Sequence, residues 1–257
     1  MKRLILISVA AIALFSGGAW GDDYDLAAEA PRAPAQEWSF EGPFGRFDRA
    51  QLRRGFQVYS ELCNGCHAIR HLYYRNLLEI GFTDDEVEAI AAEYEIEDVP
   101  SEEGEMFSRP ALPSDNFVSP FTNEKEVRAN NNGVLPPDLS LIAKARTGKY
   151  NYLYALLTGY DEEPEGFNLM EGMSFNTYFP GYQTAMPQPL DDDSVEYADG
   201  TEATLDQEAR DVVAFLTWAA SPELEERKRL GIKVMLFMLI ITAMLYALKR
   251  RIWSDVH

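Results

Sequence analysis

The only two cysteines in this chain of 257 residues lie in one pentapeptide, Cys63-Asn-Gly-Cys66-His67. A Cys-x-x-Cys-His sequence is typical of covalent attachment of a c-type haem. Each thiol can add to one vinyl group of the porphyrin, and the histidine that follows can reach the iron as an axial ligand. No cysteine remains for a disulfide framework, and a zinc site would need two further ligands. We therefore expect one haem c, bound through Cys63 and Cys66, with His67 on its iron.

The second axial ligand has to come from the opposite face of the haem. His71 lies four residues after His67, on the same side of any helix, and His257 is the C-terminal residue. Because histidine is nearly exhausted, methionine is the natural choice. Four methionines lie outside the apolar terminal segments, namely Met106, Met170, Met173 and Met186. The proline-rich surroundings of Met186 favour it on local grounds, but the residues alone leave the other three open.

The N-terminus has the pattern of a secretory signal. Met1, Lys2 and Arg3 precede an apolar run over residues 4–15, and small residues follow up to Gly21. A basic start, a short apolar region and small residues before a cleavage point are typical of a signal peptide. An uncleaved anchor is the weaker alternative because the apolar run has only 12 residues. We expect residues 1–21 to be removed and the rest of the chain to be exported.

A second apolar segment covers residues 232–248 near the C-terminus. As a helix it spans roughly 26 Å, so one further turn completes the thickness of a bilayer. Three basic residues, 249–251, follow it, with Trp253 as an interfacial anchor. With the signal peptide fixing the direction, the predicted order is an exported haem domain (22–225), a linker and membrane helix (226–250) and a cytoplasmic tail (251–257). The predicted location is a bacterial inner membrane, crossed once, with the haem domain in the periplasm.

Helical patterns dominate the exported part. Residues 22–46 contain three prolines and indicate an extended leader. Asp48 can cap a helix that has Leu52, Phe56 and Tyr59 on one face and leads into the cysteine motif. A second helix is predicted from a capping box at 204–207 until Pro222, and a third over 150–157. The first two can pack closely at Gly55. The expected fold is mainly α, with long loops in the middle of the domain and no convincing strand alternation.

The charge of the chain is strongly acidic, with 23 Lys+Arg against 42 Asp+Glu and a formal net charge of −19. Such a surface repels nucleic acid and favours a basic partner. Residues 76–108 carry twelve acids and residues 150–209 carry thirteen, and neither stretch has a Lys or Arg. Solvated loops are the ordinary explanation of such runs. Because one stretch follows the cysteine motif and the other surrounds Met186, we favour an electrostatic docking surface, although 76–108 could also form a dimer contact.

Further fragments follow the cysteine motif in a definite order. They are Asn131-Asn-Gly-Val-Leu-Pro136-Pro-Asp-Leu-Ser140, Ala145-Arg146, Leu156-Leu-Thr-Gly-Tyr160, Phe175-Asn-Thr-Tyr-Phe-Pro-Gly181 and Phe215-Leu-Thr-Trp-Ala219. In this order and spacing the chain resembles the cytochrome c1 family over nearly its whole mature length. The resemblance implies a cytochrome c-like haem domain with long loop insertions plus one C-terminal transmembrane helix.

The resemblance also implies roles for single residues. His67 and Met186 correspond to the axial ligands, whereas Asn131, Pro136 and Phe179 correspond to haem-pocket residues and Arg146 and Tyr152 to neighbours of the propionates. Thr184 and Val134 depart from the family, in which an aliphatic residue and Ala are common at those positions. A guanidinium suits a propionate because it can form two parallel hydrogen bonds to it. A surface ion pair is the alternative for Arg146.

The family implies a one-electron carrier that acts as a subunit of the ubiquinol–cytochrome c oxidoreductase. The implied partners are a cytochrome b subunit, a Rieske iron–sulfur protein as donor, a basic soluble cytochrome c as acceptor, membrane lipid and a second copy of the complex. Two alternatives keep the haem. One is a membrane-anchored cytochrome that feeds a terminal oxidase, and the other is a haem sensor or c-type peroxidase with an open sixth position.

Overall fold

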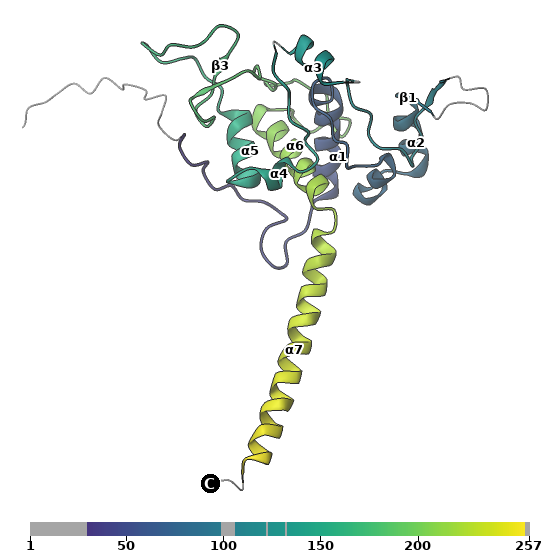
Figure 1. Cartoon of the computed structure of the whole chain (residues 1–257), viewed down its shortest axis with the longest axis vertical. Coiled ribbons are helices and arrows are strands. Elements are labelled where there is room, and N and C mark those ends of the chain that lie inside the picture. Colours follow the sequence, from purple (N-terminus) through teal and green to yellow (C-terminus); the bar gives the residue numbers. More distant parts are fainter. Residues whose placement is uncertain (1–29, 99–105, 122, 132, 255–257) are drawn as a thin grey trace, which may run out of the picture.

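The computed structural model describes residues 30–98, 106–121, 123–131 and 133–254. The expected signal peptide and the last three residues of the expected tail lie outside the described residues. A helical domain sits at one end of a single long helix, as Figure 1 shows. The prediction of a mainly α fold with one C-terminal apolar helix is confirmed.

Seven α-helices and four short strands make up the described part of the chain. The helices are α1 (Arg49–Val58), α2 (Asp84–Ala92), α3 (Glu124–Asn130), α4 (Ile142–Ala145), α5 (Lys149–Thr158), α6 (Leu205–Ala220) and α7 (Leu224–Ile252). A π-helical turn (Tyr59–Cys63) extends α1, and a 3-10 helix (Tyr74–Ile80) precedes α2. Strands β1 (Glu95–Glu97) and β2 (Ser108–Pro110) form one antiparallel pair, and β3 (Ser174–Phe175) and β4 (Gln183–Thr184) form another. These two strand pairs were not predicted.

Helices α1 and α6 cross at the centre of the domain. The Asp48 carboxylate caps α1 by accepting the Ala50 N–H at 2.9 Å, and the Thr204 hydroxyl caps α6 by accepting the Gln207 N–H at 3.2 Å. At the crossing, a Cβ added to Gly55 would lie only 2.0 Å from the Asp211 carbonyl oxygen. Both predicted helices and the close approach at Gly55 are therefore confirmed.

An aromatic core surrounds this crossing. Phe56 and Tyr59 of the α1 segment meet Phe215 of α6, with ring centroids 5.7 and 5.6 Å apart. Phe117 stacks on Tyr74 at 4.4 Å and extends the core toward α2. Edge-on and stacked ring pairs stabilise a core beyond the area they bury. This core carries the last turn of α1, from which the cysteine motif follows.

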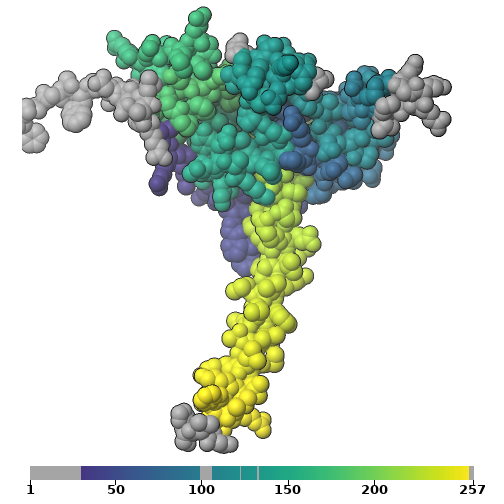
Figure 2. Space-filling view, viewed as in Figure 1, coloured from purple at the N-terminus to yellow at the C-terminus, as the bar shows by residue number. Residues whose placement is uncertain are grey.

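The first turns of α7 are fastened to the leader loop and to α1. The Glu225 carboxylate accepts the Phe47 N–H at 2.9 Å and pairs with Arg49 at 3.1 Å. The Lys228 ammonium donates to the carbonyls of Phe40 and Gly45, at 2.6 and 3.1 Å. Beyond this junction α7 stands clear of the domain (Figure 2). Its length and its exposed apolar side chains make it a candidate membrane span.

Candidate haem-attachment site

The cysteine motif continues directly from the π-helical turn at the end of α1. The chain turns back there, because the backbone N–H groups of Cys66 and His67 both donate to the carbonyl of Cys63, at 3.1 and 2.9 Å. Tyr59, only 1% exposed, lies within hydrogen-bond distance of the His67 carbonyl, at 3.3 Å. Single π-helical turns occur frequently at functional sites. The turn here joins a core helix to a half-buried Cys63 and an exposed Cys66.

The His67 ring is held in one orientation. Its Nδ1 lies 2.8 Å from the carbonyl oxygen of Pro137. A carbonyl can only accept, so Nδ1 carries the proton and donates it, and the lone pair remains on Nε2. Burial lowers the pKa of His67, while the contact with Pro137 acts in the opposite direction. The ring is therefore neutral at neutral pH with a free Nε2, which is the form that binds a metal.

The loop 131–140 provides the partner of His67. The loop is tied to the segment after the motif, since Leu139 N–H donates to the Ala68 carbonyl at 2.8 Å. Asn131 ends α3 by donating its side-chain amide to the Val127 carbonyl at 2.8 Å. Pro136 is half-buried next to the proline whose carbonyl holds the ring. Asn131 and Pro136 thus shape the loop that positions His67.

Apolar side chains lie exposed on and beside this loop. They are Val134 and Leu135, each 39% exposed, and Leu141, 48% exposed. Exposed apolar side chains next to one another are the kind of surface that a flat apolar ligand can cover. An apolar face beside a free imidazole nitrogen and two thiols fits a porphyrin.

A second group of residues forms around Met186. Its carbonyl accepts the Tyr160 hydroxyl at 3.1 Å, and its N–H donates to the Thr184 hydroxyl at 3.2 Å. The β3–β4 hairpin before it is fixed to α5 by Asn176, which is fully buried and donates to the Leu156 carbonyl at 2.8 Å. Phe179 lies half-buried in the turn of this hairpin. The half-buried Met186 therefore stands on a loop with a defined backbone.

Arg146 and Tyr152 adjoin the Met186 group. Burial raises the pKa of Tyr152, and the positive charge of Arg146 lowers it, so the two side chains are close enough to interact. Burial, and then Tyr152, raises the pKa of Tyr160, the residue that holds Met186. Arg146 is exposed and has no ion-pair partner among the residues that the structure describes. The alternative hypothesis, that Arg146 belongs to a surface ion pair, therefore has no support in the described part of the chain.

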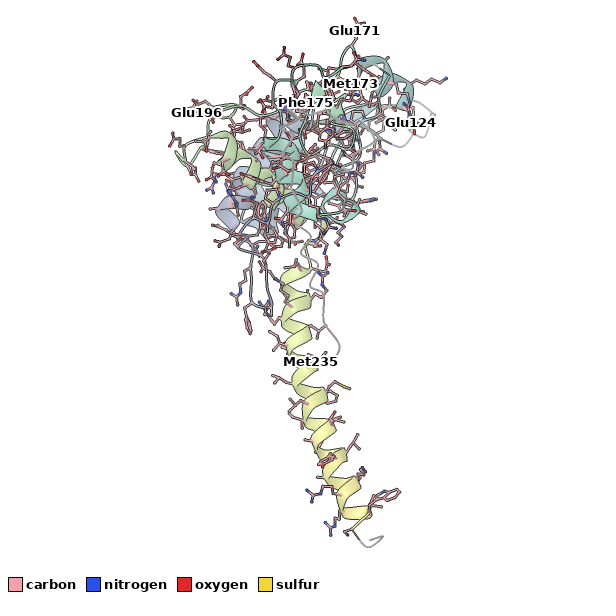
Figure 3. The ribbon with its side chains drawn as sticks, turned by 90° about the vertical axis from the view of Figure 1, so that its left-hand side faces the viewer. Glu124, Glu171, Met173, Phe175, Glu196 and Met235 are labelled. Atoms are coloured by element: carbon pink, nitrogen blue, oxygen red, sulfur yellow. The ribbon has the colours of Figure 1, made fainter. Side chains whose placement is uncertain are left out.

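Met106 lies apart from this group, whereas Met170 adjoins it, because the Met170 N–H donates to the Gln183 side chain of β4 at 3.1 Å. Met106 is 56% exposed and lies just before β2, whose partner β1 is on the opposite side of the domain from β3 (Figure 1). Met170, 53% exposed, lies in the loop before β3, and so does Met173, next to Phe175 in Figure 3. Among the four candidates, Met186 alone has its backbone held by both a hairpin residue and the half-buried Tyr160.

Some supporting residues were not predicted from the sequence. Tyr59, Tyr160 and Asn176 position the motif and the Met186 loop through hydrogen bonds, and Pro137 supplies the carbonyl for His67. For Tyr160 and Asn176 the sequence did contain a signal, because both lie in the ordered fragments by which the chain resembles the cytochrome c1 family. Two adjacent prolines give no sequence signal that tells which carbonyl faces the ring.

The His67 group and the Met186 group belong to different segments, and the helices that carry both segments pack on α6. The His67 group follows α1, and the Met186 group is fixed to α5; both α1 and α5 pack on α6. Within the described ranges no three or more His, Cys, Asp or Glu side chains cluster as a metal site. Acidic side chains lie around the part of the domain away from α7, as Glu124, Glu171 and Glu196 show in Figure 3.

Comparisons with known proteins assign the family. Residues 38–256 match the Cytochrome C1 family. A cytochrome c1 of Rhodospirillum rubrum is 50% identical over 239 residues, which are 86% of this chain and 87% of that protein. A protein of Arabidopsis thaliana named cytochrome c1 2, heme protein, mitochondrial, is 46% identical over 93% of this chain and 77% of its own length. A cytochrome b/c1 of Bradyrhizobium diazoefficiens is 43% identical over 97% of this chain, which spans 39% of that longer protein. The chain belongs to the cytochrome c1 family.

Proposed function

We propose that this chain is the haem c subunit of a quinol–cytochrome c oxidoreductase and carries one electron at a time. The observation that carries the proposal is the hydrogen bond from His67 Nδ1 to the Pro137 carbonyl beside Cys63 and Cys66. It leaves a neutral imidazole with a free Nε2 next to two thiols and an apolar loop. A haem c bound there supplies an iron that cycles between the ferric and ferrous states.

The two residue groups provide the ligands. Cys63 and Cys66 would hold the porphyrin through thioether bonds, and His67 and Met186 would be the two protein ligands of its iron. A methionine ligand raises the reduction potential of a haem, which suits an acceptor of electrons from quinol oxidation. Support for Met186 comes from its fixed backbone, because a ligand whose loop is held by Tyr160 is placed before the iron binds.

The remaining site residues orient the haem. Arg146 and Tyr152 lie next to each other and provide a cation and a hydroxyl for the propionates. Asn131 and Pro136 line the pocket on the His67 side, and Phe179 lines it on the Met186 side. None of these residues breaks a substrate bond, so the chain alone is a carrier and the enzyme is the assembled complex.

We infer the partners from the family and the charge. A cytochrome b subunit docks α7, as the name cytochrome b/c1 of one relative suggests. A Rieske iron–sulfur protein is the donor, a basic soluble cytochrome c is the acceptor, and the complex is dimeric. After export the haem domain lies in the periplasm and the C-terminus in the cytoplasm. Because exposed acids attract a basic acceptor, the association rate falls steeply as ionic strength rises; a rate independent of salt contradicts this.

The test is the visible spectrum of the full-length, membrane-extracted protein. Oxidised wild type is expected to show the weak methionine-to-iron band toward the red end. Met186→Leu is expected to lose this band, whereas the matched control Met173→Leu keeps it. A band that survives Met186→Leu transfers the ligand role to Met106, Met170 or Met173. A wild type that lacks the band contradicts the carrier proposal and favours an open sixth position.

A further inference from the structure

An open hollow of about 500 Å³ lies between the domain and the first turns of α7. Its lining is Arg49, Glu79, Pro222, Glu225, Glu226, Arg229, Leu230 and Lys233. These residues come from the start of α1, the 3-10 helix, the link between α6 and α7, and the first turns of α7. The hollow is therefore at the junction of the domain with the candidate membrane span, and neither His67 nor Met186 lines it.

The charges in this hollow are incompletely paired. Arg49 and Glu225 form an ion pair at 3.1 Å. Arg229, Lys233 and Glu226 are exposed and have no ion-pair partner among the described residues. Arg229 and Lys233 are four residues apart on one helix, where like charges repel. Two such cations on one side of the hollow are an anion-binding pair.

The hollow lies where a bilayer surface is expected. Arg229 precedes the first residue of the apolar segment, Ile232, by three residues, or roughly 4.5 Å along a helix. The nearby leader loop presents Phe44, which is 80% exposed, and this loop is tied to α7 by Lys228. An exposed aromatic ring near the start of an apolar helix is typical of the interfacial layer of a membrane. The groups that meet the hollow there are lipid headgroups.

We propose that this hollow binds the headgroup of a phospholipid that carries both a phosphate and an ammonium group, such as phosphatidylethanolamine. Arg229 and Lys233 take the phosphate, and Glu226 takes the ammonium, with Leu230 along the acyl chain. A zwitterionic headgroup fits because the hollow has three basic and three acidic lining residues, whose charges balance. An anionic lipid would find the phosphate site but would leave Glu226 without a partner. The site is independent of the haem.

The test uses native mass spectrometry of the full-length, haem-loaded chain after delipidation in detergent. We expect one phosphatidylethanolamine per chain, bound more tightly than phosphatidylglycerol. The double variant Arg229→Gln with Lys233→Gln is expected to weaken binding of both lipids by about 30-fold, since each cation near a membrane surface contributes roughly fivefold. Glu226→Gln is expected to weaken binding of phosphatidylethanolamine and not of phosphatidylglycerol.

A matched control is Lys125→Gln, an exposed cation on α3 at the end of the domain away from α7 (Figure 1), which is expected to leave lipid binding unchanged. An unaltered haem spectrum shows that each variant has folded. The proposal is overturned if phosphatidylethanolamine binds no more tightly than phosphatidylglycerol, or if the variants of α7 bind it like wild type. Equally tight binding of soluble phosphoethanolamine overturns it too, because the site is then not a lipid site.

Discussion

Substitution of Gly55 by alanine tests the close packing of α1 on α6. An alanine Cβ at this position would lie 2.0 Å from the carbonyl oxygen of Asp211 and 2.8 Å from the Cβ of Phe215. A carbon–oxygen contact between helices is normally about 3.3 Å, so the new methyl group is roughly 1.3 Å too close. The atoms it meets belong to backbone or to the base of a side chain, and they cannot swing away. The two helices therefore have to separate.

The expected cost follows from two opposing effects. Overpacking a core costs about 1–3 kcal/mol, and a clash with backbone belongs at the upper end of this range. Alanine is a better helix former than glycine by about 1 kcal/mol, which offsets part of that cost. The net loss for Gly55→Ala is therefore about 2 kcal/mol. For a domain of this size, this free energy lowers Tm by about 4–8 °C.

The assay is thermal unfolding of the full chain in detergent, followed both by far-ultraviolet circular dichroism and by haem absorbance. Gly231→Ala is the control, because Gly231 is also helical and a Cβ there meets nothing within 4 Å. The control is expected to melt at or above the wild-type Tm, because it gains helix propensity without a clash. A Gly55→Ala variant that melts within about 1 °C of wild type refutes the close crossing.

Three further predictions concern polar groups in the core and at the Met186 loop. Arg54→Leu removes the ion-pair partner of the fully buried Asp211 carboxylate, 2.7 Å away, and leaves it with the hydrogen bond from Gln207. We expect a cost of about 3–5 kcal/mol in urea unfolding, and a smaller cost when both positions are Leu; an equal or larger loss in the double variant contradicts this. Burial raises the pKa of the Glu208 carboxyl, so the folded state binds its proton more tightly than the unfolded state does. The stability of the wild type therefore falls as pH rises above about 4.3, the pKa of Glu in the unfolded chain, and through the raised pKa of the folded state. Glu208→Gln removes that part of the fall, and unchanged slopes of Tm against pH would sink the argument. Tyr160→Phe removes the hydrogen bond to the Met186 carbonyl, which is worth about 1 kcal/mol. Because added imidazole competes with Met186 for the iron, it is expected to bind the ferric haem about fivefold more tightly in this variant. An unaltered imidazole affinity contradicts the role of Tyr160.

Local signals were sufficient for the helices that form the centre of the domain. Asp48 and Thr204 are cap residues followed by apolar side chains at helical spacing, and both caps form as predicted. The same logic applies to α2, where Thr83 and Glu86 form a complete capping box. The acidic stretch 76–108 obscures this helix, because its three acidic first-turn residues look like part of that stretch. The β3–β4 pair could not be predicted, since its register depends on Asn176 contacting a distant helix.

The candidate site likewise contains residues that a local pattern identifies and residues that only the folded chain identifies. Cys63, Cys66 and His67 form a local pattern that is recognisable without any tertiary information. The choice among four methionines depends on which loop the hairpin and α5 hold in place, and the prolines around Met186 favour it locally without excluding the other three. The contact between His67 and Pro137 joins residues 70 positions apart, so only the folded chain reveals which carbonyl sets the tautomer.

Helix α1 connects the membrane junction to the haem-attachment motif. At its start, Arg49 pairs with Glu225 of α7, and the π-helical turn at its other end carries Cys63. Fourteen residues separate the two points, which corresponds to roughly 20 Å along a helix. Because Gly55 in the middle of α1 is packed directly on α6, the helix cannot slide or tilt without breaking the core. In the proposed function, this helix, fixed at its start by Arg49 and in its middle by Gly55, sets the distance between the haem and the membrane.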